Sequence, residues 1–297
     1  MSLSPQMSLR SLLFIPGNQT RKLDKAFDLR PDAFVLDLED SVPMSEKEVA
    51  RRTVAEYIDK LADTGIALFP RVNSLATGLM YDDLKAVVKP GVNGVSVGKI
   101  TDGDSVKDIA EVLNGLEKGA HLEIGHTKLI LWIETARAVI NAYEIASASA
   151  RVIGVAFGAE DFTNDMSIER TSGGKEVAYA RSATVVAAHA AGVTALETPF
   201  FSFKDLEGLR EDCRASVGLG FQGRFAIHPS QIDVIKAAYA PSQEQIDQAQ
   251  RVVKVFEEAV RNGKAATSLD GVVIDIPVVE RARKILRLAE IARLESK

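Results

Sequence analysis

The sequence predicts an α/β fold: a (β/α)8 TIM barrel with a C-terminal helical extension. Two observations favour this fold. Short β-branched apolar runs, bounded by glycine, proline or acidic residues, alternate with segments whose apolar residues have helical spacing. In addition, 297 residues are long for one domain unless that domain is an α/β barrel. We therefore predict a catalytic barrel over residues 1–240 and an extension over residues 241–297.

Each expected strand is an apolar run of the kind that forms a buried parallel strand. The eight runs cover residues 11–15, 33–38, 67–72, 94–97, 129–133, 152–157, 194–197 and 224–227. Strand and helix repeats in this number are typical of a closed barrel. The alternative is a doubly wound open sheet, but the first run is followed by Pro16, Gly17 and Asn18 and lacks the GxGxxG turn of a dinucleotide fold.

Helical apolar spacing predicts helices between these runs. The clearest cover residues 46–61, 104–116, 136–146, 177–191 and 206–219. After Ile235 the alternation stops. The remaining sequence predicts a long helix over 243–262, a linker of small residues, an extended piece over 272–276 and a final basic amphipathic helix that starts at Pro277.

Composition excludes several classes of protein. The formal net charge is -5, and no dense basic run is present, so we exclude a nucleic-acid partner. Cys213 is the only cysteine in the sequence, so no intrachain disulfide can form, which fits a reducing compartment. No apolar stretch is long enough for a signal peptide or a membrane span. We therefore expect a cytoplasmic protein that does not contact a membrane.

Two of the apolar runs end at carboxylates. Run 129–133 stops at Glu134, and run 152–157 is followed closely by Glu160 and Asp161. Parallel strands of one sheet end on the same rim, so these carboxylates should meet there. Two bare carboxylates about 4 Å apart repel by roughly 4 kcal/mol at an effective dielectric near 20, so the pair needs a proton or a cation. Two carboxylates completed by water or substrate oxygens suit Mg²⁺. The alternative for Glu134 is a carboxylate that the dipole of a following helix favours.

Basic residues follow three other strands. Arg21 and Lys25 lie on one face at a helix start, where they could bind phosphates or be solvated charges. Arg71 ends the third run and could grip a substrate carboxylate or form a structural salt bridge. Lys99 follows the fourth run, at the rim of the predicted barrel. An electrophile, a Schiff-base amine and an ion-pair partner are the alternatives for Lys99, and we favour the ion pair.

Two turns at strand ends carry further candidate residues. After the second run, Asp37, Glu39 and Asp40 could orient a metal-bound water. They could instead form structural pairs with nearby arginines, for which the candidates are Arg51, Arg52 and Arg71. After run 152–157, small residues let backbone N–H groups approach a ligand. We expect a substrate carboxylate to bind there, at Gly158, Ala159 and Glu160.

Two residues towards the C-terminus are ambiguous. His228 ends the last run, and we interpret it as a structural hydrogen-bonding residue rather than a base. Asp275 lies in an apolar strip ahead of Pro277. It could cap a helix, or its apolar surroundings could raise its pKa and make it a movable acid or base.

Several motifs together resemble the HpcH/HpaI aldolase and citrate lyase β-subunit family. They are RSLLFIPGN, VLDLEDSVP, PRVN, LILWIETARAV, FGAEDFTND, YARS, GFQGRFAIHPSQI and GVVIDIPVVERA. The resemblance covers residues 10–290 and is specific in combination. It is strongest to the branch that contains malyl-CoA and citramalyl-CoA lyases. The resemblance implies a Mg²⁺-dependent barrel, usually a homotrimer or hexamer, that breaks or forms a carbon–carbon bond next to a thioester.

The resemblance also implies roles for individual residues. Glu134 and Asp161 match the metal ligands, and Arg71 matches the residue that meets substrate oxygen. Two cations would lie on the side of the CoA phosphates, namely Arg21 and Lys25. Asp275 matches an acid or base that the C-terminal segment of a neighbouring subunit delivers in several CoA lyases, which favours a functional role for this residue.

Two departures from the family pattern concern the acyl pocket. The family often has proline before the lysine of the fourth strand, where this chain has Gly98. It often has an Asp-Gly pair after the seventh strand, where this chain has Glu197, Thr198 and Pro199. We expect both departures to reshape the pocket.

The sequence therefore predicts a lyase for a 3-hydroxyacyl-CoA such as malyl-, citramalyl- or hydroxymethylglutaryl-CoA. The products would be a 2-oxo acid or acetoacetate, and acetyl-CoA. Three alternatives stay open: the β-subunit of a citrate lyase complex acting on citryl bound to an acyl carrier protein, a class II aldolase of free 2-oxo acids, and a non-catalytic 2-oxo acid or acyl-CoA binding protein with the same barrel.

Overall fold

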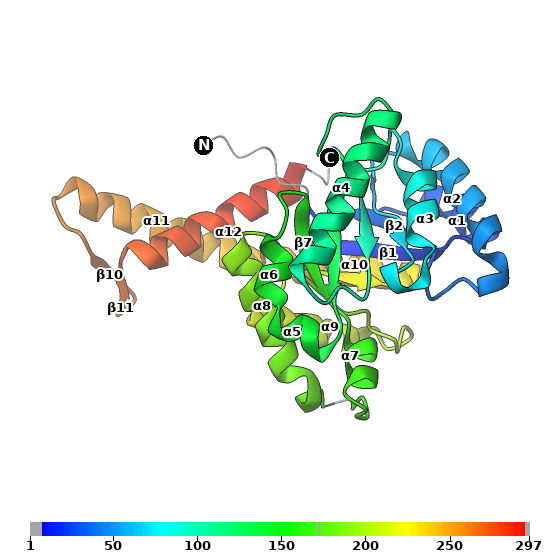
Figure 1. Cartoon of the computed structure of the whole chain (residues 1–297). Helices are drawn as coiled ribbons and strands as arrows, with labels where there is room; N and C mark the ends of the chain where they lie inside the picture. Colours follow the sequence, from blue (N-terminus) through cyan, green and yellow to red (C-terminus); the bar gives the residue numbers. More distant parts are fainter. Residues whose placement is uncertain (1–7, 172, 295–297) are drawn as a thin grey trace. The chain divides into compact units, whose positions relative to one another are not determined.

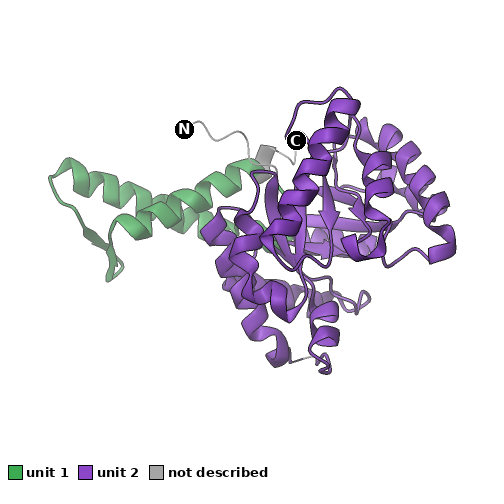
Figure 2. Cartoon of the chain, viewed as in Figure 1, with its two compact units in different colours: residues 1–8, 237–297 green, residues 9–236 purple. Residues whose placement is uncertain are grey.

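The structure is a computed structural model that describes residues 8–171 and 173–294. It contains two compact units (Figure 2). The larger one spans residues 9–236, and the second is built from residue 237 onwards. The division falls within helix α10 (Ile232–Tyr239). Each unit is described separately below.

The larger unit is a closed barrel of parallel strands (Figure 1). Strand β1 pairs with β2 on one side and with β9 on the other, and this double pairing closes the sheet. The strands are β1 (Ser11–Pro16), β2 (Ala33–Asp37), β3 (Ala67–Leu68), β4 (Arg71–Val72), β5 (Gly94–Val97), β6 (Lys128–Ile133), β7 (Val152–Phe157), β8 (Thr194–Glu197) and β9 (Gly223–Ala226). Each of the eight predicted runs contains a strand, and the predicted barrel is confirmed.

The third predicted strand is split into β3 and β4, which both pair with β2. The break falls at Phe69 and Pro70. Pro70 has no N–H to donate to the neighbouring strand, so the ladder cannot continue through it. Its carbonyl still accepts a hydrogen bond from the Ser96 N–H at 2.9 Å. The interruption therefore leaves Arg71 at the start of a short separate strand.

Helices follow the strands and surround the barrel (Figure 1). Besides α10 they are α1 (Thr20–Lys25), α2 (Lys47–Ala62), α3 (Met80–Val87), α4 (Gly103–Gly119), α5 (Ala136–Ile140), α6 (Ala142–Ser147), α7 (Ala159–Asp165), α8 (Ala178–Ala191) and α9 (Leu206–Leu219). The helix predicted over 136–146 is two helices, because Asn141 leaves helical geometry at φ -94 and ψ 11. Its side chain instead donates to the Thr101 carbonyl at 2.8 Å.

Alternate strand residues point inwards and fill the barrel. The buried interior includes Leu12, Val35, Phe69, Ile130, Trp132, Leu196 and Phe225. Three aromatic rings pack together near the carboxyl ends of the strands: Phe225 stacks on Phe14 at 5.1 Å and is tilted against Trp132 at 4.5 Å, measured between ring centroids. The Trp132 indole N–H donates to the Ser96 hydroxyl at 2.8 Å. These rings fill the barrel interior just below the rim. We call Phe14, Trp132 and Phe225 the aromatic floor.

The second unit contains two long helices joined by a hairpin. They are α11 (Gln243–Arg261) and α12 (Ile276–Leu294), with β10 (Thr267–Leu269) and β11 (Val272–Ile274) between them. Both helices were predicted, but β10 was not. The hairpin turns at Asp270 and Gly271, which both have positive φ, as a two-residue turn of this kind requires. Val252, Phe256, Ile274 and Val279 belong to the small apolar core of this unit.

None of the helices in the described parts of the chain is long and apolar enough to cross a membrane.

Candidate active site

Glu134 and Asp161 lie at the ends of neighbouring strands, as predicted. Glu134 follows β6 and is 4% exposed, while Asp161 is half-buried in the first turn of α7. Burial, with the charges of Asp161 and Glu39, raises the pKa of Glu134 to about 8. The two carboxylates are therefore close enough to repel each other. The side chain that caps α5 is Thr135, which accepts a hydrogen bond from the Ala138 N–H, so Glu134 is free of the capping role.

Two glycines provide the space that the Glu134 side chain occupies. A Cβ added at Gly158 would lie 2.6 Å from both Cβ and Oε2 of Glu134. A Cβ added at Gly98 would lie 2.9 Å from Glu134 Oε1 and 3.3 Å from Glu39 Oε1. Gly98 is one of the two departures from the family pattern. Its missing side chain faces the acidic residues directly.

Arg71 contacts three carboxylates of the charged cluster. Its guanidinium donates two hydrogen bonds of 2.7 Å to the Asp37 carboxylate and lies 3.0 Å from Glu39 and 3.2 Å from Asp40. It also covers the Phe14 ring at 4.7 Å. Burial disfavours both charges, but their mutual attraction is stronger, so the pKa of Asp37 is lowered and the pKa of Arg71 is raised. Structural pairing, one of the two predicted alternatives for Arg71, is therefore present.

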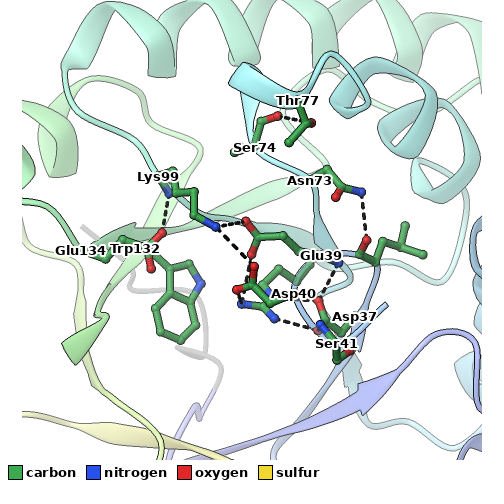
Figure 3. Close-up of polar contacts among 12 residues, drawn as sticks. Asp37, Glu39, Asp40, Ser41, Asn73, Ser74, Thr77, Lys99, Trp132 and Glu134 are labelled. Atoms are coloured by element: carbon green, nitrogen blue, oxygen red, sulfur yellow. Dashed lines mark hydrogen bonds and ion pairs between the residues drawn. The ribbon is translucent and has the colours of Figure 1, made fainter. Parts of the chain in front are cut away.

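Lys99 connects the two halves of the cluster (Figure 3). Its backbone N–H donates to Glu134 Oε1 at 2.5 Å, and its ammonium lies 2.9 Å from Glu39 and 3.3 Å from Asp40. Burial lowers the pKa of Lys99, but the acids outweigh burial and raise it overall, so the ion pair that we favoured is the observed arrangement. Lys99 has φ 57, a left-handed conformation that costs a residue with a side chain roughly 1 kcal/mol.

The charges of this cluster do not balance. Its five carboxylates face three cationic side chains, which leaves two negative charges when all are ionised. The carboxylates are Asp37, Glu39, Asp40, Glu134 and Asp161, and the cations are Lys47, Arg71 and Lys99. A divalent cation would neutralise this surplus. The donor set therefore fits a hard cation such as Mg²⁺.

The number of protein ligands is small. Among residues 8–171 and 173–294, no group of three or more His, Cys, Asp or Glu side chains is arranged to hold a metal ion. A cation at Glu134 and Asp161 would take its other ligands from water or substrate, which is usual for Mg²⁺.

The turn after β7 is partly occupied by the protein itself. The Gly158 N–H donates to the Ile133 carbonyl at 3.1 Å, and the Ala159 N–H donates to the Thr198 hydroxyl at 3.3 Å. The Glu160 side chain is exposed and lies 3.8 Å from Arg170. The clearest effect of Gly158 is thus the space it leaves for Glu134, while substrate binding by this turn stays a prediction.

The other predicted residues lie on α1, in the turn after β9 and at the start of α12. Arg21 and Lys25 are exposed on α1, directly after β1. His228 caps a short helical turn by accepting the Ser230 N–H, and its ring stacks on Phe203 at 4.8 Å. Asp275 is exposed at the start of α12, where it accepts a 3.4 Å hydrogen bond from the Val278 N–H. Helix capping, one of its two predicted alternatives, is therefore present.

Glu197, the other departure from the family pattern, points away from the barrel interior. Its carboxylate is fully buried and accepts hydrogen bonds from Arg181 of α8 at 2.6 Å and from Ser216 of α9 at 3.0 Å. Arg224 of β9 lies 3.9 Å from it. The effect of Glu197 on the acyl pocket stays a prediction. An arginine within the apolar run 224–227 could have predicted such a buried acidic partner.

The sequence analysis did not identify the residues that support the turn after β2. Lys47, Asn73 and Asp83 all contact it directly or through one another. The sequence did contain one indication of this support. Lys47 is the first residue of α2, and a cation at a helix N-terminus is unfavourable unless it has a specific partner, because it opposes the helix dipole.

The chain belongs to the HpcH/HpaI aldolase/citrate lyase family, whose model matches residues 10–229. The resemblance seen in its motifs is thereby confirmed.

Named relatives cover nearly the whole chain. It is 38% identical over 283 residues to the citrate lyase subunit beta of Escherichia coli strain K12, covering 95% of this chain and 94% of that protein. It is 30% identical over 290 residues to the mitochondrial citramalyl-CoA lyase of Homo sapiens, covering 94% and 85%.

A solved structure of protein CitE from Mycobacterium tuberculosis, in complex with magnesium, acetoacetate and coenzyme A, is also similar. Its TM-score is 0.78 at 28% identity, with 96% of this chain and 99% of that chain covered.

Proposed function

We propose that this chain is a Mg²⁺-dependent carbon–carbon lyase that cleaves, or in reverse forms, a 3-hydroxyacyl-CoA thioester. The observation that carries the proposal is the pair Glu134 and Asp161, set in a cluster with two surplus negative charges. The names of the relatives support it, since one is a citramalyl-CoA lyase and one was solved with magnesium, acetoacetate and coenzyme A. The products would be a 2-oxo acid, or acetoacetate, and acetyl-CoA.

Glu134 and Asp161 would hold the cation. When bound, Mg²⁺ would supply Lewis acidity at the hydroxyl and carboxylate oxygens of the acyl group. Lys99 would keep Glu134 in place through its backbone N–H, and Gly158 would leave the carboxylate its room.

Three parts of the chain would act on the substrate. The turn Gly158–Glu160 would hold the substrate carboxylate chiefly through the Glu160 N–H, because the N–H groups of Gly158 and Ala159 already donate to the Ile133 carbonyl and the Thr198 hydroxyl. Arg71 would meet the thioester oxygen. Arg21 and Lys25 would bind the CoA phosphates, which suits their exposed cationic side chains.

The bond-breaking step needs a base and a stabilised enolate. Asp275 would accept the hydroxyl proton, and the O–H electron pair would form the carbonyl of the oxo acid. The electron pair of the breaking carbon–carbon bond would pass to the thioester enolate, whose charge Arg71 stabilises. A proton returned to the enolate carbon would complete acetyl-CoA.

We further propose a homotrimer or hexamer in which Asp275 comes from the C-terminal extension of a neighbouring subunit, within the cytoplasm. The family resemblance of the segment around Asp275 supports the first part, and the single cysteine fits a reducing compartment.

A substrate panel tests the proposed function. Malyl-, citramalyl-, hydroxymethylglutaryl- and citryl-CoA would each be incubated with the protein and Mg²⁺, and release of the oxo acid or acetoacetate would be measured. We expect one thioester to be cleaved with a clear preference. Binding of these thioesters without any cleavage would instead favour a non-catalytic binding protein.

A second candidate function is the β-subunit of a citrate lyase complex. It is favoured by the higher identity to a citrate lyase subunit beta, 38% against 30% for the citramalyl-CoA lyase. Such a subunit would act on citryl carried by an acyl carrier protein. Turnover of citryl on the carrier protein, with no turnover of free CoA thioesters, would select this function.

A further inference from the structure

The turn after β2 carries Glu39 and Asp40, and side chains from other elements hold its backbone. We call residues 38–41 the acidic loop. The Lys47 ammonium donates to the carbonyls of Leu38 and Glu39, at 2.7 Å each. The Asn73 side chain donates to the same Leu38 carbonyl at 2.9 Å (Figure 3). These two donors thus fix successive peptide units of the acidic loop through its backbone carbonyls.

Asn73 is itself held in place. Both its backbone N–H and its side-chain amide donate to Asp83 Oδ2, at 2.9 and 2.6 Å. The other oxygen of Asp83 accepts from Arg51 of α2 at 2.9 Å. Asn73 and Asp83 are almost fully buried, at 2% and 1% exposed. Buried polar groups with this many partners have little freedom to move, so the support behind the loop is rigid.

Lys47 is in an unfavourable position unless it serves this contact. It is the first residue of α2, where the helix dipole disfavours a positive charge. Two carbonyl oxygens at short distance compensate for that, and its ammonium also attracts Asp37, Glu39 and Asp40. None of its recorded contacts in the described chain is with Glu134 or Asp161. Any effect of Lys47 on the proposed chemistry must therefore pass through the acidic loop or through Asp37, which pairs with Arg71.

The acidic loop in turn fixes the other two cations of the cluster, Arg71 and Lys99. Glu39 lies 3.0 Å from Arg71 and 2.9 Å from Lys99, so one carboxylate bridges both. Lys99 holds Glu134 by its backbone N–H and has a strained backbone that requires an anchored side chain. A shift of the loop would therefore displace Arg71, Lys99 and Glu134 together.

We propose that Lys47 is a positioning residue: by clamping the acidic loop, together with Asn73 and Asp83, it sets Arg71 and Lys99 at the places that the reaction requires. This inference rests on the proposed function, because the reaction it serves is the cleavage of a 3-hydroxyacyl thioester. Misplacement by about 1 Å can slow a reaction about 100-fold. The effect should appear mainly in kcat, because Arg71 acts on charge that develops in the transition state.

The test compares Lys47→Met with Lys47→Arg and Lys128→Met. Lys128 makes the same kind of contact at the opposite end of the barrel, where its ammonium donates to the Gly125 carbonyl at 2.8 Å. We expect Lys47→Met to lower kcat by about 10- to 100-fold with little change in KM. Lys47→Arg, which can still donate to two carbonyls, should recover most of the loss. Lys128→Met should keep the kcat of the parent protein.

Calorimetry on the same variants measures the melting temperature and the Mg²⁺ affinity. These two values distinguish a loss of positioning in the active site from a loss of stability of the fold. Equal losses of melting temperature in Lys47→Met and Lys128→Met, with unchanged kcat in both, would overturn the inference alone. If Lys47→Met cannot be purified, Lys47→Gln, whose amide reaches one carbonyl, takes its place. A parent protein with neither Mg²⁺ binding nor thioester turnover would overturn the proposed function and this inference with it.

Discussion

Glu134 is the residue of the cluster on which the proposed metal site depends most. It is buried, its pKa is raised to about 8, and its Oε1 is fixed by Lys99. The other oxygens of the five cluster carboxylates have hydrogen bonds or ion pairs, whereas Glu134 Oε2 and the Asp161 carboxylate show no such contact among the described residues. The metal-binding role proposed for these two residues is therefore open to a direct test.

We predict that Glu134→Gln or Asp161→Asn weakens Mg²⁺ binding more than about 100-fold, beyond the usual effect of losing an outer-shell partner. Thioester cleavage should be lost with it. Isothermal titration calorimetry measures the binding. Glu169→Gln, an equal change of charge on the exposed loop after α7, is the control and should bind Mg²⁺ like the parent. Full turnover after removal of divalent ions would contradict the proposal.

Gly158 allows a second test at this scale, because its role is steric. We predict that Gly158→Ala weakens Mg²⁺ binding at least about tenfold, since the new Cβ would lie 2.6 Å from the Glu134 side chain and force it aside. Gly115→Ala in α4 is the matched control, because a Cβ there meets nothing within 4 Å. An unchanged Mg²⁺ affinity in Gly158→Ala would contradict this prediction, because Mg²⁺ binding would then not depend on the position of the Glu134 side chain.

Residues at strand ends were predictable from the sequence, but their partners were only partly so. An acid directly after an apolar run, such as Glu134, must lie at the rim of a parallel barrel. Whether Arg71 pairs with protein or with substrate depends on distances between separate strands, which no local pattern records. The positive φ of Lys99 was likewise not predictable, because lysine has no local preference for this conformation.

Single elements are joined to the barrel by buried ion pairs as well as by apolar packing. At the end opposite the cluster, Glu117 of α4 receives two hydrogen bonds from Arg151, at 2.7 and 2.6 Å, just before β7. The N–H groups of Thr127 and Gly125 donate to the same carboxylate. Burial opposes the charge of Glu117, but these donors outweigh it and lower its pKa to about 2.

This pair makes the attachment of α4 dependent on pH. A lowered pKa means that the pair stabilises the fold fully above about pH 4.5 and loses its effect as the pH falls towards 2. We predict that Glu117→Gln lowers the free energy of unfolding by about 3 kcal/mol near neutral pH, and that the difference from the parent narrows below pH 4.5.

Urea denaturation at a series of pH values measures this effect. Glu111→Gln on the same helix is the control, because Glu111 is exposed and should change stability by less than about 0.5 kcal/mol. A difference between Glu117→Gln and the parent that is constant from neutral to acidic pH would contradict the assignment.

At the scale of elements, the sequence predicted where strands and helices lie better than where they break. The third strand reads as one run, yet Pro70 removes the N–H on which its ladder depends. The helix over 136–146 reads as continuous, yet Asn141 bonds to the Thr101 carbonyl of another segment. Strand β10 was missed because Thr267–Leu269 is too short to carry a pattern of its own.

For the molecule as a whole, the source of Asp275 decides whether one chain is sufficient for catalysis. If a neighbouring subunit supplies this residue, a site with an intact Glu134 can use the Asp275 of another chain. We predict that Asp275→Asn and Glu134→Gln are each inactive alone, because one lacks the base and the other the metal ligand. Mixed in equal amounts and reassembled, they should recover part of the parent activity.

The steady-state rate of oxo-acid release from the mixture measures this complementation. A mixture of Glu134→Gln with Asp161→Asn has both defects in the barrel unit and is a useful control, which should stay inactive. No recovery in the first mixture would mean that Asp275 serves its own chain or none.

The barrel as a whole was predictable because its signal is repeated. Every strand and helix unit carries the same apolar period, so errors in single elements do not change the fold class. The extension has no such repetition. Amphipathic spacing predicts its helices, but no local sequence pattern indicates whether Asp275 acts in the active site of its own chain or of a neighbouring chain.

The aromatic floor beneath the rim has a practical consequence, because Trp132 is the only tryptophan in the sequence. It lies two positions before Glu134, and its ring packs at a tilt against Phe14, which Arg71 covers. Any ligand that draws Arg71 off that ring alters the surroundings of a single indole. The intrinsic fluorescence of the unlabelled protein should therefore shift in wavelength as a thioester or 2-oxo acid is titrated in, and Trp132→Phe should emit no such signal.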